Sequence, residues 1–242
     1  MEWSRKSATN AYFDTLKLCN EHLEQGNLCK TQELESNEFI SAMAAGMSAK
    51  LIVEVTSEVS LSTIALAAAA RQTGGKLVCI LPEPTQDEVQ KVIEDSGLDD
   101  IVEFKTGDPV ELLPNYENID FCLVNCKTDN YMRLLKLLDV NPRRSVVVAN
   151  NLLEGRKGLG GHVKGMENKV KVRSMKHPIG RGMEITMIGK GTETGVGDRS
   201  RRCVHRTDRK GGFVKRTDKS KWIVKVDEKS GEEHIFRLPK TF

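Results

Sequence analysis

Several features are missing from this 242-residue sequence. No apolar run is long enough to span a membrane, and the first residues lack the apolar core of a signal peptide. The six cysteines are not spaced as metal-binding pairs, and Cys79, Cys122 and Cys126 lie on or beside apolar, strand-like runs. We therefore expect a cytoplasmic protein, with the nucleus as the alternative, whose cysteines are reduced core thiols without a disulfide framework.

Glycine is missing from one particular turn, which is the most informative absence. The apolar run 51–53, followed by Val55, predicts a strand buried on both faces, and apolar residues recur at helical spacing from Leu61 to Ala70. A strand, a turn and a helix start can bring backbone N–H groups and the positive helix end to a ligand. In nucleotide-type sites that turn is rich in glycine, because a Cβ keeps the ligand off the backbone. Residues 56–60, Thr-Ser-Glu-Val-Ser, contain none.

Strand-like and helical stretches alternate over most of the chain. This alternation predicts the α/β class, with a parallel sheet and right-handed crossovers, followed by an antiparallel edge pair over 170–175 and 183–188. The first helix is expected over 8–25, with Tyr12, Leu16, Cys19 and Leu23 inward, and the second behind Ser36 or Asn37 as N-cap. The other expected strands are 76–81, 101–104, 119–124 and 145–149, and the other expected helices lie around 89–97, 109–113 and 129–138.

Charge is distributed unevenly along the chain. Residues 191–242 carry 14 Lys and Arg against 8 Asp and Glu, a net charge of +6, whereas residues 1–190 carry 23 against 26, a net charge of −3. We predict one domain over 1–190 with N-terminal helices in 1–50, a basic linker over 191–221 and a C-terminal β-hairpin over 222–242. A hairpin alone is marginally stable, so it must pack on the core, a partner or another copy.

A series of landmarks in fixed order runs from Glu38 to Lys190. These are Phe39-Ile40, Glu54-Val55, residues 61–67, 74–80, Gly107-Asp108, 119–121, 129–131, 147–151 and 178–182. In this order they resemble the S-adenosylmethionine-dependent methyltransferases, and in particular the cation-dependent O-methyltransferases of the caffeoyl-coenzyme A type. The resemblance implies a Rossmann-like methyltransferase fold with a mostly parallel, seven-stranded sheet and helices on both faces. The start Met-Glu-Trp-Ser and the ending over 222–234 also resemble a plant family of unknown function, usually labelled methyltransferase-like.

The resemblance implies an S-adenosylmethionine site whose key positions have changed. Thr56, Glu58 and Ser60 stand where the family has glycines, and Leu81 stands at the acidic ribose position, with Glu83 as a substitute two residues later. The two metal-binding carboxylates correspond to Asn125 and Asn150, and the third ligand is retained as Asn151. A hard divalent cation depends on carboxylate oxygens, so we expect no metal.

Eight residues are the candidate cofactor contacts, and several of them have a structural alternative. Ser57 would otherwise cap the following helix, with Glu58 complementing its positive end. Glu54 would be a satisfied buried carboxylate, Asp108 and Asp120 would cap turns or helices, and the three asparagines would bond loop backbone. The candidates are Glu54, Thr56, Ser57, Glu58, Ser62, Glu83, Asp108 and Asn125.

Three functions follow from these observations. The leading hypothesis is a methyltransferase-like protein without cation-dependent chemistry, acting as a weak S-adenosylmethionine binder or a non-catalytic interaction protein. The second is an active, metal-independent methyltransferase with an unidentified acceptor. The third is a nucleic-acid-binding module that uses the basic tail. The expected partner is a small molecule or a protein, a second copy included, and no membrane is involved.

Overall fold

A computed structural model describes residues 3–25, 34–84, 87–125, 131–152, 157–159, 170–189, 222–226 and 233–237. The chain divides into two compact units, 1–193 and 194–242. No helix in the described ranges is both long and apolar enough to cross a lipid bilayer.

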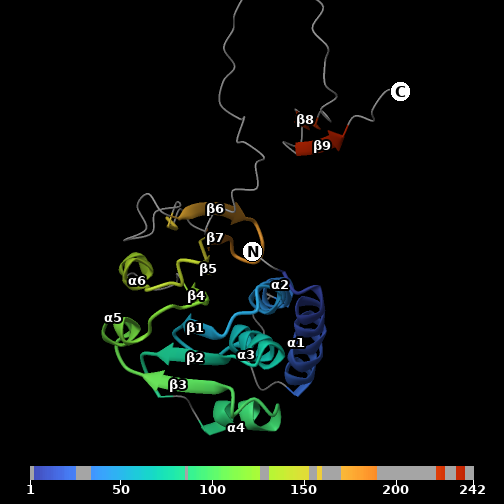
Figure 1. The fold of residues 1–242 in the computed structure, drawn as a ribbon. Helices are drawn as coiled ribbons and strands as arrows, with labels where there is room; N and C mark the ends of the chain where they lie inside the picture. The colour runs from blue at the N-terminus through green and yellow to red at the C-terminus, as the bar shows by residue number, and fades with distance from the viewer. Residues whose placement is uncertain are drawn as a thin grey trace, which may run out of the picture. The chain divides into compact units, whose positions relative to one another are not determined.

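A seven-stranded sheet forms the centre of the first unit, in the order β3-β2-β1-β4-β5-β7-β6 (Figure 1). The five strands from β3 to β5 pair in parallel, and β7 and β6 add an antiparallel edge. This is the Rossmann-like methyltransferase sheet that was predicted. The bounds are β1 Leu51–Val55, β2 Lys76–Leu81, β3 Val102–Thr106, β4 Phe121–Asn125, β5 Arg144–Asn150, β6 Lys171–His177 and β7 Met183–Gly189.

Helices cover both faces of this sheet, as Figure 1 shows. Apolar side chains of α1 to α4 share one buried cluster with Ile52, Phe121 and Val148, whereas side chains of α5, η1 and α6 share another with Val53 and Val147. Successive strand residues point to opposite faces, so each central strand contributes to both clusters. The bounds are α1 Arg5–Gln25, α2 Leu34–Gly46, α3 Leu61–Thr73, α4 Asp87–Asp95, α5 Pro109–Leu112, η1 Leu113–Asn115 and α6 Tyr131–Leu137.

The inward face of α1 differs from the prediction. Tyr12 and Leu16 are 41% and 37% exposed, whereas Ala8, Ala11 and Thr15 are buried. Small side chains allow α1 to pack closely against α2 and α3, and the large ones lie outside. Of the predicted stripe, Cys19 is buried, and the side chain of Leu23 lies outside the described residues.

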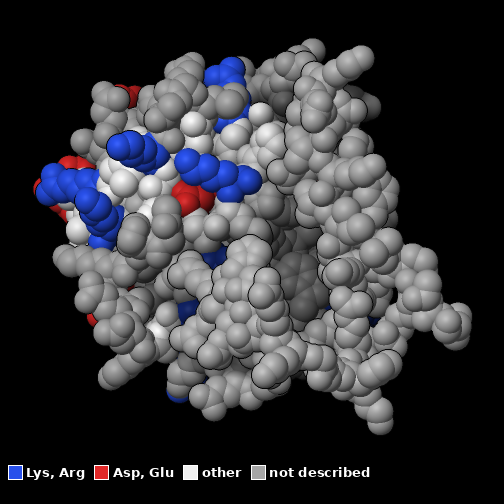
Figure 2. Space-filling view, turned by 90° about the horizontal axis from the view of Figure 1, so that it is seen from above, with Lys and Arg blue, Asp and Glu red and all other residues white. Residues whose placement is uncertain are grey.

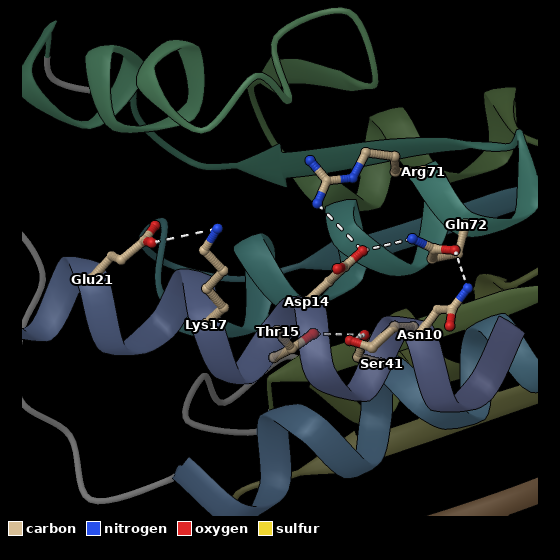
Figure 3. A network of polar contacts seen from close by, with 9 residues as sticks. Asn10, Asp14, Thr15, Lys17, Glu21, Ser41, Arg71 and Gln72 are labelled. Atoms are coloured by element: carbon tan, nitrogen blue, oxygen red, sulfur yellow. Dashed lines mark hydrogen bonds and ion pairs between the residues drawn. The ribbon is translucent and has the colours of Figure 1, made fainter. Parts of the chain in front are cut away.

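Polar contacts fasten α1 to its neighbours (Figure 3). Gln72 of α3 donates to Asp14 at 2.6 Å and accepts from Asn10 at 3.3 Å. Thr15 donates to Ser41 of α2 at 2.8 Å inside the buried interface. The two N-terminal helices are therefore part of the sheet domain.

Several predicted boundaries move by a few residues. The second helix begins at Leu34, so Ser36 and Asn37 lie within α2 and the predicted N-cap is wrong. Both side chains are buried. Ile119 forms only an isolated bridge with Val140, because β4 begins at Phe121.

The described cysteines Cys19, Cys79 and Cys122 are free and buried. Burial raises the pKa of Cys19 to about 12 and also raises those of Cys79 and Cys122, so these thiols are protonated at neutral pH. Cys126 lies outside the described residues.

The described residues of the second unit form an antiparallel pair, β8 Trp222–Val226 with β9 Glu233–Arg237. This is the C-terminal hairpin that was predicted. Its register joins Trp222 to Arg237 and Val226 to Glu233. The predicted basic linker over 191–221 lies outside the described residues.

Candidate functional site

A small cleft opens at the carboxyl ends of the parallel strands, where ligands bind in open α/β sheets. Its volume is about 120 Å³. It lies on the face that α5 and α6 cover, and residues at or just beyond the carboxyl ends of β1, β2, β3 and β4 all contribute to it. The described residues that line it are Val55, Thr56, Ser57, Pro82, Asp108, Pro109, Val110, Asn125 and Leu134.

Four of the eight predicted cofactor contacts line this cleft: Thr56, Ser57, Asp108 and Asn125. Asp108 also caps α5, since its carboxylate accepts from Val110 N at 2.8 Å. The other four are not among the lining residues that the structure describes: Glu54, Ser62, Glu58 and Glu83.

Glu54 lies on the opposite face of β1 and is completely buried. Its carboxylate accepts hydrogen bonds from Ser62 of α3 and, at 3.6 Å, from Cys79 Sγ of β2. Burial raises the pKa of Glu54, and these hydrogen bonds oppose that rise in part. Through these hydrogen bonds, the carboxylate of Glu54 links β1 to β2 and α3.

The turn after β1 is closed by its own side chains. Thr56 is 6% exposed, and its hydroxyl donates to Glu58 O at 3.0 Å. The prediction that Ser57 caps the following helix is wrong, because the N-cap of α3 is Ser60. Ser60 Oγ accepts a hydrogen bond from Ser62 N, and Ser60 N donates to Thr63 Oγ1 at 3.3 Å. A capping box pairs the N-cap residue with the third residue of the helix, and because α3 begins at Leu61 these positions are Ser60 and Thr63. Side chains at the start of α3 therefore accept hydrogen bonds from some of the backbone N–H groups that the helix itself leaves without a partner.

Two further acidic candidates lie away from the cleft lining. Glu58 and Glu83 are both exposed, in the turns after β1 and β2.

Asp120 is buried at the opposite, amino end of the strands, where Oδ2 accepts from Lys50 N at 2.8 Å and Oδ1 from Asn141 Nδ2 at 2.9 Å. Asp120 therefore ties the start of β1 to the loop before β5.

The three asparagines predicted at the degenerate metal positions do come together beside the cleft. Asn151 Nδ2 donates to Asn125 Oδ1 at 2.8 Å, and Asn151 N donates to Asn150 Oδ1 at 2.9 Å. Asn150 and Asn151 are 5% and 6% exposed. Asn151 has a φ of +60°, which asparagine tolerates better than most residues. Their proximity follows from pairing Asn125 with Asn150 across β4 and β5.

This donor set does not fit a divalent cation such as Mg²⁺. All three side chains are neutral amides, and two of the carbonyl oxygens already accept hydrogen bonds. A hard cation requires negatively charged oxygens to offset its dehydration. In the described part of the chain, no group of three His, Cys, Asp or Glu side chains could hold a metal ion.

Residues 157–159 contribute contacts near the site that the sequence did not reveal. Lys157 N donates to the hydroxyl of Tyr131 at 2.8 Å, and Gly158 lies directly against the carboxylate of Glu184 on β7. Glu184 is 2% exposed and accepts from Ser174 of β6. Nothing in the sequence pairs a glycine of the loop with an acid 26 residues later, so only the structure could find this contact.

Among solved structures, the chain is similar in fold to several methyltransferases. It has a TM-score of 0.52 and 18% identity with a methyltransferase from Geobacter sulfurreducens, over 71% of this chain and 85% of that one. With the O-methyltransferase from Bacillus cereus in complex with SAH, the TM-score is 0.51 and the identity 22%, over 72% of this chain and 90% of that one. With the O-methyltransferase TomG from Streptomyces achromogenes in complex with SAM, the TM-score is 0.51 and the identity 20%, over 78% of this chain and 99% of that one.

No curated protein matches this sequence. The sequence pattern of one protein family, described as a protein of unknown function (DUF1442), matches residues 1–238. Since that match covers nearly the whole chain, this protein belongs to the DUF1442 family, and its fold is that of the methyltransferases.

Proposed function

We propose that this protein is a methyltransferase-like protein without cation-dependent chemistry, which binds S-adenosylmethionine weakly or acts as a non-catalytic interaction protein. The observation that carries the proposal is the set of hydrogen bonds joining Asn125, Asn151 and Asn150. A cation-dependent enzyme would use a metal there to polarise and orient the acceptor hydroxyl. The three neutral amides supply no negative charge for that role, and two of their three carbonyl oxygens, those of Asn125 and Asn150, already accept hydrogen bonds.

The cleft supports weak binding. Its volume of about 120 Å³ is below the roughly 300–1,000 Å³ of typical small-molecule pockets. The Cβ and methyl group of Thr56 occupy space that a glycine would leave open, and Ser60 bonds part of the N–H groups at the start of α3. Among the described lining residues, Ser57, Asp108 and Asn125 are the ones that offer polar side chains to an adenosyl ligand besides Thr56.

Titration calorimetry of the full chain with S-adenosylmethionine, with and without MgCl₂, tests this proposal. We expect a Kd weaker than about 100 μM that Mg²⁺ does not change. Thr56→Gly and Leu134→Ala enlarge the cleft and should each tighten binding, whereas Leu138→Ala, in the same cluster but outside the cleft lining, should not. Micromolar binding that depends on Mg²⁺ would contradict the proposal.

An active, metal-independent methyltransferase is the second candidate. It is favoured by the position of Asp108 and Asn125 at the carboxyl ends of β3 and β4, around one cleft. Methyl transfer needs mainly the alignment of acceptor, methyl carbon and sulfur, so losing a metal does not abolish it. Transfer of a labelled methyl group from S-adenosylmethionine to any component of a cell extract would favour this candidate, provided that Asn125→Ala abolishes the transfer.

A further inference from the structure

The outer edge of β6 is free of any pairing strand in the described part of the chain. β6 is the last strand of the sheet, and only β7 pairs with it, in an unbroken register from Lys171–Gly189 to His177–Met183. A strand paired on one side has backbone N–H and C=O groups directed outward on the other. Such an edge can accept a further strand.

This edge is strongly cationic. Lys171, Arg173 and Lys176 of β6 and Arg181 of the following turn are all exposed, and none of them has an ion-pair partner among the described residues. The only acid in 170–189 is Glu184, which is buried. Figure 2, seen from above relative to Figure 1, shows several lysine and arginine side chains on the described part of this face, with a few acidic side chains among them.

Exposed cationic and apolar side chains lie along one face of β6. Lys171, Arg173 and Met175 alternate along the strand, so they share one face of the sheet. Met175 is 44% exposed, although Ile185, the residue of β7 with which it pairs, is buried. This face therefore offers two cations followed by one apolar side chain at intervals of two residues.

We propose that the outer edge of β6 binds an extended, acidic segment of a partner protein by strand addition. An antiparallel segment would place one apolar residue opposite Met175 and acidic residues opposite Arg173 and Lys171, giving the order apolar-x-acid-x-acid. Opposite charges directly across a strand pair attract, and like charges repel. A second copy of β6 is thereby disfavoured as occupant, because it would bring a second row of unpaired cations to the same edge.

Fluorescence anisotropy of the full chain with the labelled peptide Thr-Thr-Val-Thr-Glu-Thr-Glu-Thr-Thr tests the proposal. We expect saturable binding that weakens about tenfold in the double variant Lys171→Glu/Arg173→Glu. The matched control, Lys6→Glu/Lys91→Glu, makes the same change in net charge on α1 and α4 and should leave binding unchanged. A peptide of the same composition with adjacent glutamates should bind more weakly, because adjacent side chains point to opposite faces.

The contribution of the backbone is measured separately. Two peptides N-methylated at alternate residues, in the two registers, remove the N–H groups of one side of the strand or the other. One of them should lose binding, and the unmodified peptide should slow hydrogen exchange of residues 171–177. If both methylated peptides bind equally well, or if a thymidine oligonucleotide binds through Lys171 and Arg173 while the peptide does not, the edge is only an anion-attracting surface and the proposal is wrong.

Discussion

Asn151 donates a side-chain hydrogen bond to Asn125 across the carboxyl ends of β4 and β5, at a distance of 2.8 Å. The same residue donates its backbone N–H to Asn150 at 2.9 Å. Asn151 thus bridges, through its side chain and its backbone, the two positions at which the resemblance to cation-dependent methyltransferases would place carboxylates. The hydrogen bonds of the amides stabilise this edge of the cleft without an ion, because a neutral amide can donate and accept whereas a carboxylate only accepts.

The double variant Asn125→Asp/Asn150→Asp should create a response to Mg²⁺. Two neighbouring carboxylates repel each other, so we expect the Tm to fall without metal and to recover when MgCl₂ is added. The wild-type Tm should not respond, and neither should that of Asn115→Asp/Asn118→Asp, which adds the same charge at exposed positions. Thermal unfolding followed by circular dichroism measures each Tm. An equal response in both double variants would mean that the ion acts on net charge and not at this site.

Ser60 and Ser57 offer a matched pair for the helix start. Ser60→Ala removes the N-cap of α3 and should lower the free energy of unfolding by about 1 kcal/mol. Ser57 is exposed and makes no cap, so Ser57→Ala should change that energy by less than about 0.5 kcal/mol. Urea unfolding of both variants measures the difference. Equal losses would contradict the observed cap.

Glu54 should make stability depend on pH. Because burial raises its pKa above the ordinary value of 4.5, the native state keeps a proton that the unfolded chain has released. The free energy of unfolding should therefore fall as the pH rises from 4.5 through the raised pKa of the native state. Glu54→Gln cannot ionise, so its stability relative to wild type should increase over that range. Urea unfolding at several pH values measures this, with the exposed Glu58→Gln as control; a parallel pH profile for wild type and Glu54→Gln would contradict it.

The sheet could be predicted from sequence because its strands are buried on both faces. Runs such as residues 77–81 and 146–149 are continuously apolar, and the helices between the strands require parallel crossovers. The orientation of α1 could not be predicted in the same way. Hydrophobicity favoured Tyr12 and Leu16 as the inward residues, whereas the close approach of three helices selected Ala8, Ala11 and Thr15.

The candidate site was only partly predictable for a related reason. Asn125 and Asn150 end paired parallel strands, so the strand pattern alone brings them together. The side of the strand matters as much as its end: Glu54 immediately precedes the cleft residue Val55 but points to the opposite face. Leu134 reaches the cleft from α6, nine residues beyond β4, and no spacing rule indicates that contact.

Gly158 should not tolerate a side chain. A Cβ at this position would overlap the carboxylate of Glu184, which is itself 2% exposed and bonded to Ser174. Gly158→Ala should therefore lower the free energy of unfolding by about 1–3 kcal/mol, because the buried carboxylate of Glu184 must shift to admit the added methyl group. The double variant Gly158→Ala/Glu184→Ala separates this clash from a general effect of alanine at residue 158. Shortening Glu184 removes the overlapping atoms, so Gly158→Ala should cost less in the Glu184→Ala background than in wild type. Urea unfolding of the four proteins gives the coupling energy, and strictly additive losses would show that residues 157–159 do not lie against β7 in solution.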